Sequence, residues 1–315
     1  MDIGTLVGRL VLEDDASAAM STFGSNLDKI GGKMMSAGAT LTVGLTAPLV
    51  AAAGASLLFS GNFEASMTRL VSLAGVSQEQ LAGVKQHILD LAPAVGIGPQ
   101  ALAEAMTKVS STVGDTATAL AILDTAAKLS AAGMGEAVSV AGAITAVVNS
   151  YGAENITAAR AADILTQAVK DGGAEAKELA PTLANVVPIA AQMGVSFEEV
   201  GANLATLTKL GVPTAEAVTQ LTSVFTAMLK ETAQGKDALA GVGLSYAGLR
   251  AEIKDKGLMD TLVHLSTVFK GNETGLTDVF GRIEALKNVM GTAGQQAKTY
   301  ATVLDNVKHS SDGLG

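Results

Sequence analysis

Residues 190–221 read AAQMGVSFEEVGANLATLTKLGVPTAEAVTQL and contain two helix starts, each placed after a helix stop. Ser196 and Glu199 fit a capping box, in which each side chain accepts a hydrogen bond from the other residue's backbone N–H. Apolar residues then follow at a spacing of three or four, the period of one helix face. Gly211 ends the run, because glycine readily adopts the left-handed conformation of a helix end. The stretch predicts short helices joined by tight turns.

The same arrangement returns elsewhere in the chain. Residues 75–79, Gly-Val-Ser-Gln-Glu, match residues 194–198, Gly-Val-Ser-Phe-Glu. Ser77 and Gln80 then fit a second capping box. Pro93 is expected to end the helix that follows, because proline has no backbone N–H and its ring clashes with the preceding turn.

Apolar residues continue at helical spacing through the rest of the chain. Further helices are expected to start at Pro99 and Thr214, and helix stops are expected at Gly133 and Gly194. Connections this short make neighbouring helices pack antiparallel or at steep angles. The apolar stripes are, in chain order, Leu102, Met106, Val109 and Val113; Leu120, Leu123, Ala127 and Ala131; Val140, Ile144, Val147 and Tyr151; Val218, Leu221, Phe225 and Leu229; Leu258, Leu262, Leu265 and Phe269; and Ile283, Leu286 and Met290.

The expected fold is mainly α, a multi-helix array of short antiparallel helices with an apolar helix near the N-terminus. Leucines alternate with other residues over Thr5–Leu12, which allows one short strand there. The expected segments are an N-terminal strand and helix segment (1–33), an uncharged apolar segment (34–63), a helical domain (64–307) and a truncated tail (308–315).

Residues 34–63 carry no charged side chain: MMSAGATLTVGLTAPLVAAAGASLLFSGNF. The run is long enough to cross a bilayer, whose core needs about 20 apolar residues. Ala47, Ala51 and Ala55 form a row of small residues of the kind through which membrane helices pack. Ser, Thr and Gly dilute the segment, however, and Pro48 interrupts or starts a helix. Two interpretations stay open: a buried or partner-packed helix, and a transmembrane helix candidate.

Composition limits the classes of function. The chain is 48% hydrophobic and 16% charged, too apolar for a disordered protein. Its net charge is −9 and no Lys/Arg cluster stands out, which argues against nucleic-acid binding. The absence of Cys removes disulfides, thiolate metal sites and cysteine nucleophiles. The acidic start, MDIGTLVGRLVLEDD, does not fit a secretory signal.

The histidines offer no obvious site. His87, His264 and His309 lie far apart in the sequence, and none of them lies in an HExxH motif. Each is expected to be a solvated or helix-boundary residue, since a zinc site needs several ligands brought together. The sequence therefore predicts no metal, no cofactor and no cofactor-binding residue.

The acidic residues are equally unpromising for catalysis. Glu198 and Glu199 form an acidic pair, but helix N-termini attract acids through the helix dipole alone. Glu64 follows the apolar run and could be a buried acid, with Arg69 as the expected ion-pair partner. A single acid still lacks an orienting partner and a donor for developing charge. We predict no catalytic residue and no enzymatic activity.

Four stretches, taken in order, resemble the N-terminal conserved region of phage tail tape measure proteins. They are SAGATLTVGLTAPLVAAAG (36–54), FEASMTRLVSLAGVS (63–77), residues 190–221, and VFGRIEALKNVMG (279–291). The first resembles the family's Thr-x-Pro start of an apolar helix, the second its Phe-Glu-x-x-Met segment. The third resembles its Gly-x-Ser-x-Glu-Glu helix and hinge, and the fourth its late Phe-Gly block. The resemblance spans about residues 30–310.

The resemblance implies a structural protein of the virion. Such a protein takes part in tail assembly and tail length determination, and inserts into the host membrane during DNA ejection. Expected partners are the tail tube, tail tip or baseplate, and tail assembly chaperone proteins, with the host membrane at ejection, self-association in the tail and no small-molecule substrate. The expected locations are the virion, the bacterial host cytoplasm during assembly and the host membrane at ejection. The alternative is a stand-alone, membrane-active, pore-forming helical protein.

Overall fold

The computed structural model describes residues 62–293 and 296–310. Contacts between residues divide the chain after Gly61, and all described residues belong to the second unit, Asn62–Gly315. Every regular element in the described part of the chain is a helix, which confirms the mainly α prediction. The strand predicted at Thr5–Leu12 and the apolar helix predicted before residue 62 lie outside the described residues.

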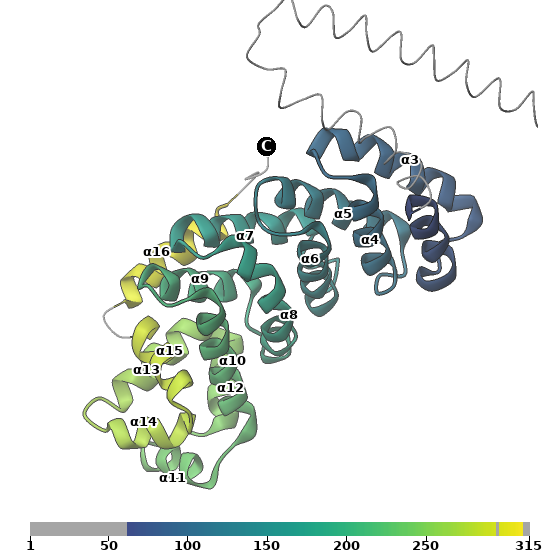
Figure 1. Cartoon of the computed structure of the whole chain (residues 1–315). Helices are drawn as coiled ribbons and strands as arrows, with labels where there is room; N and C mark the ends of the chain where they lie inside the picture. The colour runs from purple at the N-terminus through teal and green to yellow at the C-terminus, as the bar shows by residue number, and fades with distance from the viewer. Residues whose placement is uncertain (1–61, 294–295, 311–315) are drawn as a thin grey trace, which may run out of the picture. The chain divides into compact units, whose positions relative to one another are not determined.

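Helical residues 62–74 precede a series of helices labelled α3 to α16 (Figure 1). Whether successive helices run antiparallel stays a prediction. The bounds are α3 Gln78–Val95, α4 Pro99–Ser110, α5 Thr116–Ala131, α6 Ala137–Tyr151, α7 Ala158–Gly172, α8 Ala176–Met193, α9 Phe197–Lys209, α10 Thr214–Lys230, α11 Ala233–Gly241, α12 Tyr246–Lys256, α13 Leu258–Val268, α14 Glu273–Phe280, α15 Ile283–Ala293 and α16 Ala297–Lys308.

The predicted helix boundaries are largely confirmed. Both capping boxes form, one at the start of α3 and one at the start of α9. α4 begins at Pro99 and α10 at Thr214. Gly133, Gly194 and Gly211 all have positive φ, at 89°, 78° and 85°. Local sequence therefore fixes where most of these helices start and stop.

The expectation that Pro93 ends its helix is wrong. α3 continues to Val95 and ends at Gly96, whose φ is 69°. Proline in the last turn removes only one backbone hydrogen bond, and Ala92 beside it is buried, so packing of the apolar face keeps the helix intact. α8 likewise contains Pro181 and Pro188 within its bounds.

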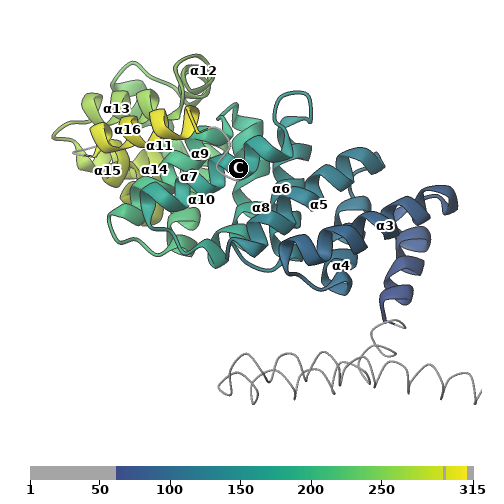
Figure 2. The same cartoon turned by 90° about the horizontal axis from the view of Figure 1, so that it is seen from above.

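The helices pack around one continuous apolar core built mainly from Ala, Val and Leu. α6 contacts α4, α5 and α8, whereas α9 contacts α7, α8, α10, α15 and α16. Figure 1 and Figure 2 show α9 beside α7 and α16 in both views. α9 therefore contacts helices from before and after it in the chain, which makes its N-terminus a place where distant segments can meet.

Of the apolar stripe predicted for α15, only Leu286 packs against the core. Ile283 and Met290 are 65% and 59% exposed, while Asn288 and Val289 are fully buried. Periodicity shows that a face exists but not which face is inside. Here Asn288 exchanges hydrogen bonds with Asn203 of α9, so the oxygen and the nitrogen of each buried amide have a partner.

The apolar segment 34–63 reaches the described residues only at its last two positions. Asn62 and Phe63 are helical, and Phe63 is buried in the core. Among the described helices, none has the length and hydropathy required to cross a bilayer.

Candidate functional site

The histidines lie apart, each against a nearby acid. His87 Nε2 is 2.6 Å from Asp124 Oδ1, and His264 Nδ1 is 2.9 Å from a carboxylate oxygen of Glu252. His309 contacts Asp305 four residues earlier. The residues that the structure describes contain no group of three His, Asp or Glu side chains placed to hold a metal ion.

Glu64 pairs with a different base from the one expected. Its carboxylate contacts the ammonium group of Lys85 in α3, not Arg69. Both partners are exposed, so Glu64 is a surface acid and not a buried one. The ion pair forms between two helices that pack together, a contact that residue spacing along one helix cannot indicate.

Several buried or partly buried polar groups meet at the start of α9. Ser196 caps the helix, with its hydroxyl accepting from the backbone N–H of Glu199 at 3.3 Å. Glu199 Oε2 accepts in return from the backbone N–H of Ser196 at 3.2 Å. Glu199 is only 8% exposed, an unusual position for a carboxylate unless its oxygens are hydrogen-bonded.

The second oxygen of Glu199 serves a different helix. Oε1 accepts a hydrogen bond of 2.6 Å from the backbone N–H of Leu258, the first residue of α13. α13 has no side-chain cap of its own, since Gly257 occupies its N-cap position. A carboxylate at this point also meets the positive end of the α13 dipole. Glu199 thus caps both α9 and α13, and its contact with Leu258 joins residues 59 positions apart in the chain.

Glycine at position 257 is required by this contact. Its φ is 93°, a conformation that residues with a Cβ rarely adopt. A Cβ built there would lie 2.6 Å from Oε1 of Glu199. The bare backbone of Gly257 therefore lets the carboxylate reach the N-terminus of α13.

Glu198 holds a third segment through Arg160. The guanidinium of Arg160, near the start of α7, donates to Glu198 Oε1 at 3.1 Å. The same group donates to the carbonyl oxygens of Val307 and Lys308, each at 2.9 Å, and contacts the carbonyl of Ser310. Arg160 thereby ties the end of α16 to the starts of α7 and α9, and five guanidinium donors suit such a shared role.

Two phenols complete the junction. The Tyr151 hydroxyl donates to the carbonyl of Val195 at 2.9 Å, and burial together with the charges of Glu198 and Glu199 raises the pKa of Tyr151. Tyr300 is fully buried and donates to the carbonyl of Glu199 at 3.3 Å. Burial, and then the charge of Glu199, raises the pKa of Tyr300 as well. Both phenols stay protonated and act as donors.

The sequence indicated only part of this junction. The pattern of Ser196 and Glu199 predicts the local cap, and the acidic pair by itself indicates only a favourable interaction with the helix dipole. The contacts to Leu258 and Arg160 were missed, because no spacing rule links residues so far apart. The one available signal was Glu198 and Glu199 together with Gly257, an N-cap glycine without a capping side chain.

Comparisons with known proteins agree in relating the chain to phage tail proteins. Residues 102–291, more than half of the chain, match the model of the family described as phage-related minor tail protein. The chain is 25% identical over 246 residues to the tape measure protein of Pneumococcus phage Dp-1, covering 78% of this chain and 21% of that protein. It is 30% identical over 312 residues to a protein named as a probable tape measure protein of Clostridium phage phiCD119, covering 95% and 32%. The chain thus spans a third or less of these relatives. No solved structure matches.

Proposed function

The chain belongs to the phage-related minor tail protein family, and on that premise we propose that its helical body is the anchoring module of a tape measure that sets tail length. The two relatives confirm the resemblance of the sequence to tape measure proteins. This relationship supports a role in tail assembly and a location in the virion. Length determination by the whole protein, which is longer in both relatives, is part of the proposal.

The observation that supports an anchoring role is the use of the charged residues at the start of α9. Glu199 caps α13, and Arg160 binds Glu198 and the end of α16. Each of these groups forms hydrogen bonds that join helices. None of them faces an open polar cleft of the kind that a catalytic acid, base or nucleophile requires. The arrangement suits a body that stays folded while other proteins assemble on it.

The partners proposed for this body are the tail tube, the tail tip or baseplate and tail assembly chaperones, together with other copies of the chain in the tail. We propose no small-molecule substrate and no catalysis. The proposal of no catalysis would be overturned if the purified chain hydrolysed peptidoglycan and a single substitution abolished that activity.

The test uses the intact phage gene with the change Glu199→Ala. We expect this substitution to destabilise the body, because it leaves two backbone N–H groups without their partner. Far fewer complete tails should then form, with the few that form at normal length in electron micrographs. Gln80→Ala, at the exposed capping box, is the matched control and should leave both number and length unchanged. The anchoring role would be rejected if Glu199→Ala phage made a normal number of complete tails although the purified Glu199→Ala chain was unfolded.

A membrane role at ejection is a second candidate, favoured by the absence of charge in residues 34–63. It would add the host membrane to the virion and the host cytoplasm as locations of the protein. Deletion of residues 34–61 should abolish binding of the chain to liposomes of bacterial lipids while leaving its helical circular dichroism. Equal liposome binding by both forms would remove this candidate. Leakage of liposome contents caused by the chain alone would favour the stand-alone pore-forming alternative.

A further inference from the structure

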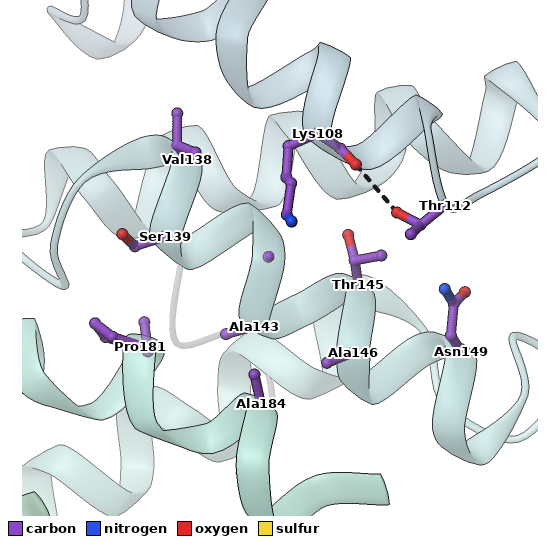
Figure 3. Close-up of a pocket in the computed structure, with 12 residues that line it drawn as sticks. Lys108, Thr112, Val138, Ser139, Ala143, Thr145, Ala146, Asn149, Pro181 and Ala184 are labelled. Atoms are coloured by element: carbon purple, nitrogen blue, oxygen red, sulfur yellow. Dashed lines mark hydrogen bonds between the residues drawn. The ribbon is translucent and has the colours of Figure 1, made fainter. Parts of the chain in front are cut away.

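A groove of about 450 Å³ lies between α4, α6 and α8, away from the junction at the start of α9 (Figure 3). α6 forms its floor, and the other two helices form its walls. Its size falls in the range of pockets that hold ligands or side chains of a partner. The lining residues are Lys108, Thr112, Val138, Ser139, Gly142, Ala143, Thr145, Ala146, Asn149, Ala180, Pro181 and Ala184.

The floor is an outward face of α6 made of small residues. Ser139, Gly142, Ala146 and Asn149 follow one another at spacings of three and four, so they share one face over about 15 Å of helix. Glycine inside a helix lowers stability relative to alanine. A Cβ on Gly142 would meet nothing within 4 Å, so no packing inside the described body requires glycine there.

Thr145 adds a second and independent observation. Its side chain is 5% exposed, and its hydroxyl has no hydrogen-bond partner within the described structure. Other buried threonines, such as Thr206 and Thr292, donate to the carbonyl four residues earlier. Figure 3 shows the Thr145 hydroxyl directed towards the side of the groove that carries Lys108 and Thr112. An unmet buried hydroxyl is costly, and a ligand in the groove would meet it.

The charge of the groove indicates what that ligand carries. Lys108 is the one ionised residue in the lining, and no described acid forms an ion pair with it. The side chains of Ser139 and Asn149 supply further hydrogen-bond donors. On a chain with a net charge of −9, a donor-rich groove with a positive charge and no acid is complementary to a carboxylate.

We propose that this groove docks an acidic helix of another protein. A carboxylate of that helix meets Lys108 and Thr145, and its backbone approaches α6 over Gly142 and Ala146. A helix is favoured over an extended segment because the floor is a helical face of small residues between two helical walls, the geometry that ridge-into-groove packing fills. The groove recognises the partner by this chemistry whether or not the partner is a tail protein.

The experiment titrates the full chain, labelled at its alanine methyl groups, with a synthetic alanine-based helical peptide that carries glutamate at every fourth position. The matched peptide carries glutamine instead. We expect the glutamate peptide to shift the methyl signals of Ala143, Ala146 and Ala184, and the glutamine peptide to bind about tenfold more weakly because it lacks the charge. Shifts of equal size with both peptides, or none at these methyls, would overturn the proposal.

Variants separate recognition from folding. Lys108→Glu should weaken binding of the glutamate peptide about tenfold or more, while Lys230→Glu, an equal change of charge on α10, should not. Gly142→Leu should fill the groove and block both peptides. Thr145→Val should weaken binding while leaving the melting temperature unchanged or higher, because it removes a buried hydroxyl without a partner.

Unchanged binding in Lys108→Glu, or equal loss in Lys230→Glu, would reject the site. Concentration-dependent dimerisation of the chain that Gly142→Leu abolishes would assign the groove to a second copy and overturn the proposed partner.

Discussion

The starts of α3 and α9 share the same local structure but have different surroundings. Both follow Gly-Val-Ser, both N-cap serines have φ −69° and ψ 155°, and both capping boxes are complete. Gln80 of the first box is exposed and bonds only within its own turn, whereas Glu199 of the second is buried and also caps α13. One local motif therefore serves as a simple helix start in one place and as a junction in the other.

The position of each helix explains the difference. α3 lies near the start of the described series and contacts α4 and α5, while α9 is packed by helices from before and after it in the chain. The family match, residues 102–291, includes the second box and not the first. A carboxylate has acceptor capacity on two oxygens, so it can serve two helices where a second one is within reach.

The largest effect is expected from Glu199→Gln. An amide has one acceptor oxygen, so it cannot accept from both Ser196 and Leu258, and one buried backbone N–H loses its partner. We expect a loss of about 2–3 kcal/mol in the free energy of unfolding, measured by urea denaturation of the full chain. The reverse exchange at the first box, Gln80→Glu, should change stability by less than about 0.5 kcal/mol. Similar values for the two substitutions would show that the burial of Glu199 has no energetic consequence.

Gly257→Ala tests the same junction from the side of α13. The new methyl group would be strained at positive φ and would lie 2.6 Å from the Glu199 carboxylate. We expect a loss of about 2 kcal/mol. Gly75→Ala, also at positive φ but with nothing within 4 Å of the new Cβ, should cost about 1 kcal/mol from backbone strain alone. Thermal unfolding of both variants checks the order, and an equal shift would mean that Glu199 moves aside freely.

Gly194→Val compares the loops that precede the two helices. Gly194 and Gly75 have φ of 78° and 70°, so valine is strained at both, and we expect each substitution to cost more than about 1 kcal/mol. The loss at Gly194 should be slightly larger, because its Cβ would approach the flexible side chain of Lys254. A melt unchanged by Gly194→Val would refute the interpretation of this turn.

Glu252 tests whether burial alone makes a carboxylate contribute strongly to the stability of the fold. Its side chain is 13% exposed, but its partners are the side chains of His264 and Lys256, not a helix N-terminus. Burial by itself raises the pKa of Glu252, yet the hydrogen bonds from His264 and Lys256 outweigh it and lower the pKa below 4.5.

The sign of the pH dependence follows from that direction. When the pKa of a carboxyl group is lower in the folded chain than in the unfolded chain, its charge stabilises the fold at any pH above the unfolded-state pKa. This contribution is lost as the pH falls through the folded-state pKa. Glu252→Gln should therefore lower the melting temperature at pH 7 by only about 1–2 °C, and the difference should shrink below pH 4.5. A difference that grows on acidification would contradict the direction of the pKa shift.

The amino-acid sequence by itself determined the helices, their caps and most of their ends. The capping residues Ser77 and Ser196 and the turn glycines act within four or five residues, and such short-range chemistry can be seen directly in the order of residue types. The family resemblance also rests on the sequence alone. The expectation for Pro93 failed because packing of a helix face can outweigh the loss of one local hydrogen bond.

Only the tertiary structure decided which helix faces are buried and which distant groups meet. The buried face of α15 includes Asn288, which pairs with Asn203, and the partner of Glu64 is Lys85. The second role of Glu199 depends on α13 arriving with a bare glycine at its start. Such contacts join residues tens of positions apart, and no periodicity or spacing in a single sequence records which of many suitable partners the packing of helices brings within hydrogen-bond distance.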